Sequence, residues 1–122
     1  MTPSQAVDQI IAIRGARTAT VVDYYARLSL ASRTRSSDLD PSAIAAVDTD
    51  VFRAELDALK AFGYEVGALR DITVSLLDRS HIIVPVLNRG WQGVFLHLAL
   101  DRGAELAGAQ DRLREVARAI EV

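Results

Sequence analysis

The stretch that decides the fold is residues 71–102, DITVSLLDRSHIIVPVLNRGWQGVFLHLALDR. It contains three short apolar runs, ITVSLL (72–77), HIIVPVL (81–87) and GVFLHLAL (93–100), joined by connections of only a few residues. Parallel neighbours in a sheet need a crossover of about a dozen residues or more. The three runs are therefore predicted to be adjacent antiparallel strands.

The third run is apolar on both of its faces. Alternate residues of a strand point to opposite sides of the sheet. One side of this run carries Val94, Leu96, Leu98 and Leu100, and the other carries Phe95 and Ala99. A strand of this kind belongs inside a sheet that helices cover on both faces. In a short chain such a sheet leaves little concave space for chemistry, which favours an interaction module.

Length and composition place the chain among soluble globular proteins. Its 122 residues suit a single domain, 1–122, with one core. The net charge of −2, with both signs interleaved, provides no basic stripe for nucleic acid. The absence of cysteine excludes disulfides, thiolate catalysis and thiolate zinc sites. We expect a cytoplasmic protein without membrane insertion, because no signal peptide or membrane-spanning run is recognisable.

The rest of the chain alternates between helical and strand patterns. Thr2-Pro3-Ser4-Gln5 has the form of a capping box, and Gly15 is placed to close the helix that it starts. Asp40-Pro41 starts a long second helix that Gly63 ends. The predicted elements are a helix from Pro3, strands at 16–24 and 28–33, a helix at 41–62, strands at 72–77, 81–87 and 93–100, and a helix from about Ala104.

This order, helix, two strands, helix, three strands, helix, resembles the roadblock family of dynein light chains and bacterial small-GTPase regulators. The resemblance covers nearly the whole chain. It is carried by the segments IIAIRGARTATVVD (10–23), LDPSAIAAVDTDVFRAELDAL (39–59), SHIIVPV (80–86), VFLHLALDR (94–102) and ELAGAQDRLREV (105–116). One departure is the turn at 24–27, Tyr-Tyr-Ala-Arg, where the family usually has glycine.

The resemblance implies an α/β fold of the roadblock/profilin-like type. Its five-stranded antiparallel sheet has the order 2-1-5-4-3, with one long helix on one face and two helices on the other. The implied function is a non-enzymatic regulator or scaffold of a Ras-like small GTPase, similar to a GTPase-activating protein and acting as a homodimer. Homodimeric members join their sheets through the third strand and lay their second helices side by side. The alternatives are a small-ligand or haem-binding sensor and a purely structural adaptor.

The second helix carries the main functional signal. At about 100° per residue its apolar residues form two stripes. One stripe contains Ile44, Val47, Val51, Ala54, Ala58 and Phe62, and the other contains Ala45, Phe52, Leu56 and Leu59, with Asp48 and Glu55 between them. Either both stripes form one wide core face, or one packs on the sheet and the other on a partner. The predicted dimer or partner interface is Ala45, Val51, Phe52, Glu55, Leu56, Leu59, Thr73 and Ser75.

The third strand supports a pairing role for its edge. Ile72, Val74 and Leu76 are predicted to form its core face, and only Asp71 and Asp78 flank its open side. An unprotected edge is a template for pairing with another strand unless a loop shields it. In the fourth strand Pro85 is expected to mark the fraying end, because proline removes a ladder donor.

The candidates for chemistry are weak. His81 is predicted at a turn or strand end and His97 as a hydrogen-bonded core residue, without metal-ligand spacing. GAELAGAQ (103–110) lacks the lysine and hydroxyl of a phosphate loop. Trp91 suits either partner contact or simple packing. The thirteen arginines could include an arginine finger, but they are spread over every element. No catalytic, metal or cofactor site is predicted.

Overall fold

The computed structural model describes residues 1–35, 39–88, 90 and 92–120. Its elements are α1 (Pro3–Ile11), β1 (Ala16–Asp23), β2 (Leu28–Thr34), α2 (Pro41–Ala61), the 3₁₀ turn η1 (Val66–Ala68), β3 (Ile72–Ser75), β4 (Arg79–Val86), β5 (Val94–Asp101) and α3 (Leu106–Ala119). The predicted order of helices and strands is confirmed. The prediction for Trp91 falls outside the described residues.

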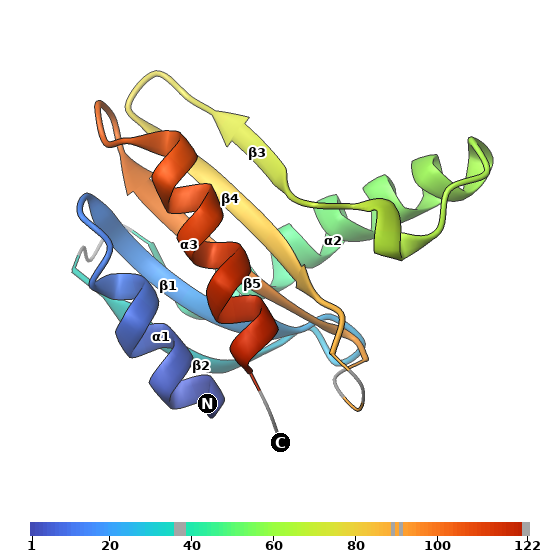
Figure 1. Ribbon diagram of the computed structural model, residues 1–122, viewed down its shortest axis with the longest axis horizontal. Coiled ribbons are helices and arrows are strands. Elements are labelled where there is room, and N and C mark those ends of the chain that lie inside the picture. The colour runs from blue at the N-terminus through green and yellow to red at the C-terminus, as the bar shows by residue number, and fades with distance from the viewer. Residues whose placement is uncertain (36–38, 89, 91, 121–122) are drawn as a thin grey trace.

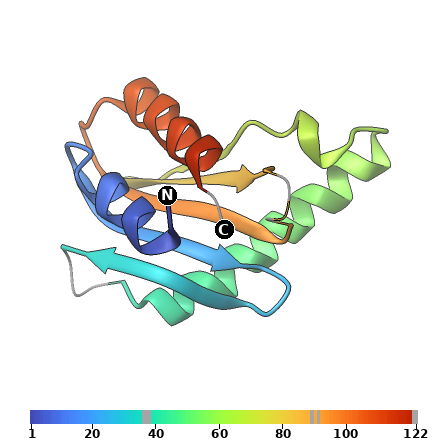
Figure 2. The same ribbon diagram turned by 60° about the horizontal axis from the view of Figure 1, so that its bottom comes forward.

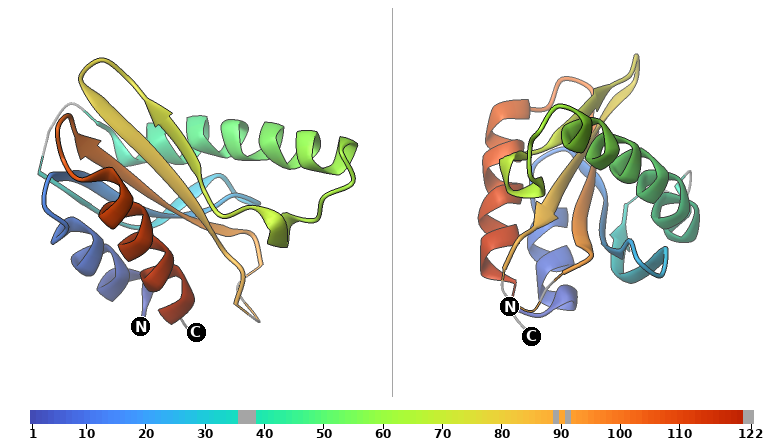
Figure 3. Two further views of the ribbon diagram at one scale, coloured as in Figure 1. Left: turned by 45° about the horizontal axis from the view of Figure 1, so that its top comes forward. Right: turned by 90° about the vertical axis from the view of Figure 1, so that its right-hand side faces the viewer.

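The five strands form one antiparallel sheet in the order β2-β1-β5-β4-β3, as predicted. Helix α2 covers one face, and α1 and α3 cover the other, which Figure 1 and the right-hand view of Figure 3 show. The central strand β5 is buried from Val94 to Leu100, in agreement with its apolar pattern on both faces. The two edges of the sheet are formed by β2 and β3.

Two apolar clusters lie on the two faces of the sheet. The larger one joins α1 and α3 to the sheet and includes Leu96, Leu98 and Leu113. The smaller one lies under α2; its buried members are Val22, Ala45, Phe52, Ile83 and Phe95. The buried residues Ala109, Leu113, Val116 and Ala117 form the core face of α3. The helix itself begins later than predicted, because Glu105 is its N-cap and accepts a hydrogen bond from Gly108 N at 2.8 Å.

Strand β3 is shorter than the predicted run 72–77. It ends at Ser75, and the backbone N–H of Leu76 donates to the carbonyl of Arg79 at 2.7 Å, which closes a tight turn into β4. The predicted core face of this strand is wrong beyond Ile72. Val74 and Leu76 are both exposed, because β3 is an edge strand and Leu76 lies in the turn that follows it.

The turn between β1 and β2 is tight although it lacks glycine. Arg27 adopts a positive φ of 58°, and the carboxylate of Asp23 accepts hydrogen bonds from the backbone N–H groups of Tyr25 and Ala26. An aspartate side chain that bonds the following backbone stabilises such a turn. At the other end of the sheet, Pro85 is the penultimate residue of β4, so its missing donor falls near the strand end.

Candidate functional site: the exposed apolar surface of α2 and β3

Helix α2 is positioned by its caps and by an aromatic anchor. Its N-cap, Asp40, accepts a hydrogen bond from Ser42 N at 3.0 Å, and Pro41 occupies the first turn. Phe52 lies against the sheet, with its ring centroid 4.8 Å from that of Tyr24 and 5.1 Å from that of Phe95. Beyond this anchor the C-terminal end of α2 extends past the sheet, as Figures 1 and 2 show.

The two stripes of α2 have different environments. Ala45 and Phe52, with Thr49 between them, are buried on the sheet. In the other stripe Ile44 is buried, whereas Val47 is 60% and Val51 38% exposed. The structure thus supports the two-surface interpretation of the helix: one stripe belongs to the core, and most of the other faces outward.

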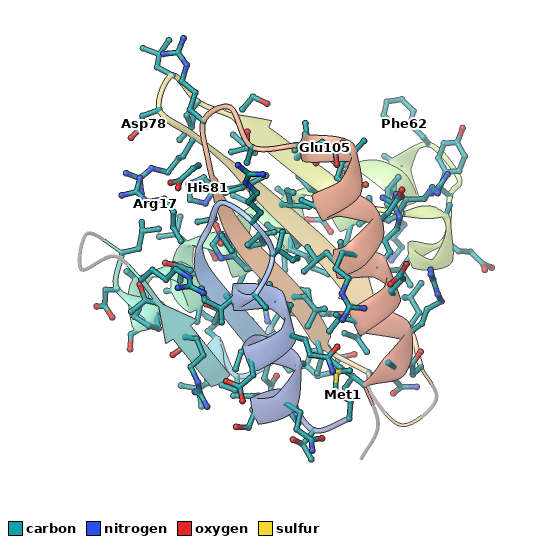
Figure 4. The ribbon with its side chains drawn as sticks, turned by 60° about the vertical axis from the view of Figure 1, so that its left-hand side comes forward. Met1, Arg17, Phe62, Asp78, His81 and Glu105 are labelled. Atoms are coloured by element: carbon teal, nitrogen blue, oxygen red, sulfur yellow. The ribbon has the colours of Figure 1, made fainter. Side chains whose placement is uncertain are left out.

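The exposed stripe continues beyond the end of the helix. Phe62 is 80% exposed and points away from the body of the protein (Figure 4). Tyr64 and Val66, in the segment that follows, are also exposed. A cluster of large, exposed apolar side chains is uncommon on a small protein, and it marks a surface that a partner covers.

Strand β3 adds apolar residues to this surface. Val74 pairs with His81 on the α2 face of the sheet, and Leu76 and Leu77 follow in the turn, where Leu77 is 92% exposed. The outer edge of β3 pairs with no other described strand. We call the exposed residues of these elements the α2–β3 surface; they are Val47, Val51, Phe62, Tyr64, Val66, Val74, Leu76 and Leu77.

The predicted interface residues divide between this surface and the interior. Val51 belongs to the α2–β3 surface, Ser75 is exposed on β3, and Glu55, Leu56 and Leu59 are half-buried along α2. Ala45 and Phe52 are core residues, and this corrects their assignment, because side chains already covered within the chain have no area left for a partner.

Thr73, the remaining predicted interface residue, faces α3. Its hydroxyl donates to Asp71 at 2.9 Å and accepts from the side chain of Gln110 at 3.1 Å. The sequence did not identify Val74, Leu76 and Leu77 as surface residues. Their apolar pattern would be the same in a covered strand and in an exposed one.

A buried polar cluster lies beneath α2. His97 of β5 is fully buried, and its Nε2 lies 2.9 Å from Nδ1 of His81 on β4 and 3.2 Å from Oδ2 of Asp48 on α2. Nδ1 of His97, the hydroxyl of Thr20 and Oδ2 of Asp48 have no hydrogen-bond partner among the described residues. The core position predicted for His97 is confirmed, whereas His81 lies within β4 and not at its end.

Burial sets the protonation of this cluster. It raises the pKa of Asp48 to about 6. Burial, with a smaller contribution from His81, lowers the pKa of His97 to about 3. The pKa of His81 is lowered by burial and by Arg79, against an opposing effect of Asp78. At neutral pH the cluster therefore contains an ionised Asp48 beside a neutral His97.

The remaining sequence candidates have structural roles in the described part of the chain. Arg53 donates to the carbonyl of Tyr24 at 2.6 Å, and Arg79 pairs with Asp78 at 3.0 Å. In the segment 103–110 the Glu105 side chain occupies the space beside Gly108. Among the described residues no group of three histidine or carboxylate side chains could hold a metal ion. None of the helices within the described ranges could cross a membrane.

The comparison with solved structures identifies the class of fold as roadblock/LC7. A Roadblock/LC7 domain from Streptomyces avermitilis matches with a TM-score of 0.80 and 13% identity, over 98% of this chain and 94% of that one. MglB of Myxococcus xanthus matches with a TM-score of 0.75 and 14% identity, over 94% and 85%.

Two further MglB structures have the same fold. One, described as having a tetrameric arrangement, matches with a TM-score of 0.80 and 16% identity, over 95% of this chain and 82% of that one. The gliding protein MglB from Thermus thermophilus matches with a TM-score of 0.69 and 16% identity, over 94% and 87%. No family model and no curated protein sequence matches the chain.

Proposed function

We propose that this chain is a non-enzymatic regulator of a Ras-like small GTPase and acts as a homodimer. The observation that carries the proposal is the α2–β3 surface, where exposed valine, leucine and aromatic side chains lie beside an unpaired strand edge. Such a surface on a small protein is suited to protein partners. The GTPase role comes from the resemblance to the roadblock family, which the fold supports.

A second copy of the chain is the first partner that this surface suits. Homodimers have two-fold symmetry, so one patch covers the same patch on the other copy. Pairing of two β3 edges would satisfy the free backbone groups of Ile72–Ser75. The same arrangement would bring the exposed stripes of two α2 helices together and cover Val47 and Val51. The joined helices would then form the platform for the GTPase.

A regulator must bind one nucleotide state of its GTPase more tightly than the other, because equal binding shifts no equilibrium. We expect the dissociation constants for a candidate GTPase loaded with GDP and with a non-hydrolysable GTP analogue to differ by about tenfold or more. Isothermal titration calorimetry with separately loaded samples measures this ratio. Val51→Asp should weaken binding to the preferred state, and the exposed change Asp57→Asn on the same helix is the control.

The mechanism is expected to be conformational and not to depend on one inserted arginine. Single replacements of Arg53, Arg79 and Arg89 by alanine should leave any stimulated GTP hydrolysis within about tenfold, because an arginine finger contributes about a thousandfold or more. A thousandfold loss at one of them would mean direct catalysis in the GTPase site. Equal affinity for both nucleotide states, with unchanged hydrolysis, would leave the structural adaptor as the function.

A further inference from the structure

A cleft lies on the side of the sheet that α3 covers, opposite α2. It has a volume of about 260 Å³ and is found at the C-terminal end of β4, between the segment around η1 and the last turns of α3. Its apolar side chains are those of Leu69, Val84, Pro85, Leu87 and Ala117. Leu87 is 53% exposed, so part of the apolar floor is accessible from solvent.

The charged residues of this cleft are all arginines. Arg70, Arg114 and Arg118 line it, and no carboxylate is among its lining residues. Arg114 is neutralised by Asp71, whose carboxylate lies 2.7 Å from the guanidinium. Among the residues that the structure describes, none forms a hydrogen bond or an ion pair with the guanidinium group of Arg70 or of Arg118. The cleft therefore offers two uncompensated guanidinium groups beside an apolar floor.

Another cleft of the protein also has two arginines in its lining, but it has no excess of positive charge. The cleft beside the start of α3 has Arg14 and Arg102 in its lining, but Asp101 and Glu105 line it as well. The two positive and two negative side chains of this cleft therefore cancel in net charge. Of these two clefts, only the one between η1 and α3 has an excess of positive charge, and hence a preference for an anionic occupant.

The walls of the cleft are tied together. The side-chain amide of Asn88, two residues beyond the end of β4, donates to the carbonyls of Ala117 at 3.0 Å, Arg118 at 3.2 Å and Ile120 at 2.7 Å. The ion pair of Arg114 with Asp71 joins α3 to the start of β3. A site whose walls are already fixed loses little conformational entropy when it is occupied.

The size of the cleft indicates the kind of occupant. Sites that enclose small-molecule ligands measure about 300–1,000 Å³, and this cleft is smaller. Its volume suits one or two side chains of a peptide. Guanidinium groups bind carboxylates through paired hydrogen bonds, and the apolar floor suits an adjacent aliphatic side chain. We propose that the η1–α3 cleft binds an acidic segment of a partner protein, with aspartate or glutamate side chains on Arg70 and Arg118 and an aliphatic side chain between them.

This site is separate from the proposed GTPase function. Helix α3, which forms one wall of the cleft, lies on the face of the sheet opposite α2 (Figure 3). The cleft adjoins the α2–β3 surface at η1, where Val66 belongs to that surface and Gly67 lines the cleft. A homodimer joined through α2 and β3 would carry two such clefts. A partner bound there could be held at the same time as a GTPase, and failure of either proposal leaves the other intact.

The test is a selection of random 12-residue peptides displayed on phage against the immobilised full-length chain. We expect enrichment of sequences that combine two acidic residues with a leucine or isoleucine. The most enriched peptide, made with a fluorescent label, should bind the double variant Arg70→Gln/Arg118→Gln about tenfold or more weakly, because the variant lacks both charged hydrogen-bond donors. Leu87→Ser should also weaken binding.

The matched control is Arg14→Gln/Arg102→Gln, which removes the same two charges from the other cleft. It should leave the affinity of the labelled peptide unchanged, and circular dichroism checks that both double variants are folded. Equal weakening by the two double variants would mean non-specific attraction to positive charge and would overturn the proposal. Selection without acidic enrichment, or unchanged binding by the first double variant, would overturn it as well.

Discussion

Phe52→Asp is expected to abolish folding of the chain. Phe52 is fully buried between α2 and the sheet, in contact with the rings of Tyr24 and Phe95. Loss of a buried phenylalanine costs about 3–5 kcal/mol, and an unpaired buried carboxylate adds several kcal/mol. The sum is comparable with the whole stability of an ordinary domain, about 5–15 kcal/mol. Circular dichroism should show an unfolded chain at 25 °C.

The matched variant is Val51→Asp, one residue along the same helix. Val51 faces outward, so its change should cost the single chain about 0.5 kcal/mol or less. We expect the native circular dichroism spectrum but a mass near 13.3 kDa by light scattering, in place of the doubled mass of the parent. A folded Phe52→Asp chain, or a Val51→Asp chain that remains dimeric, would contradict the assignment of inner and outer stripes.

Opposite pH dependences are expected when the two ends of the buried Asp48–His97 contact are replaced in turn. For Asp48 the pKa rises from 3.8 to about 6 on folding, so between these values the folded chain holds a proton that the unfolded chain has released. This contribution stabilises the fold at low pH and is lost as the pH rises through about 6.

The sign is reversed for His97. Its pKa falls from 6.5 to about 3 on folding, so the unfolded chain holds a proton that the folded chain lacks. This contribution is present above about pH 6.5 and is lost as the pH falls towards 3. Between about pH 4 and 6 the two effects offset each other in the parent chain, because the loss of one proton balances the gain of the other.

When one of the two residues is replaced, the pH dependence of stability that the other one causes is no longer offset. Relative to the parent, the free energy of unfolding of Asp48→Asn should increase from pH 4 to 6, and that of His97→Gln should decrease. Each difference should reach about 2–3 kcal/mol, because one proton changes the stability by up to about 1.4 kcal/mol per pH unit. Urea unfolding at several pH values measures both, with Asp57→Asn as the control. Parallel curves, or differences of the same sign, would refute the account of the cluster.

The arrangement of the sheet could be predicted because its signals are local. Short connections between apolar runs fix antiparallel neighbours, and the two-sided apolar pattern of residues 94–100 fixes the central strand. The caps at Thr2 and Asp40 fix where two helices begin, and both are present in the structure. The order β2-β1-β5-β4-β3 came from the resemblance to the roadblock family, and the structure agrees.

The candidate site depended on facts that no local pattern contains. Helical periodicity showed two apolar stripes on α2, but which of them faces the sheet follows from the packing of Phe52 between Tyr24 and Phe95. The contact of His81 with His97 depends on the register of β4 against β5. Asp48 joins them only because α2 crosses the sheet at that point. Val74 is exposed because β3 is the last strand at one edge of the sheet, and its neighbours in the sequence do not reveal this.

The most direct test of the α2–β3 surface uses the absence of cysteine from the chain. Single cysteines at Val51, Ala54 and Ala58 would each report whether two α2 helices meet, since a disulfide forms only when two Cα atoms come within about 7 Å. After mild oxidation at micromolar concentration, we expect a covalent dimer from at least one of these variants. Cysteines at the exposed positions Ala12 and Ala107, on the other face of the sheet, should remain monomeric on non-reducing gels. Cross-linking at Ala12 or Ala107 with none at the three α2 positions would show that the chain associates elsewhere and would contradict the proposed interface.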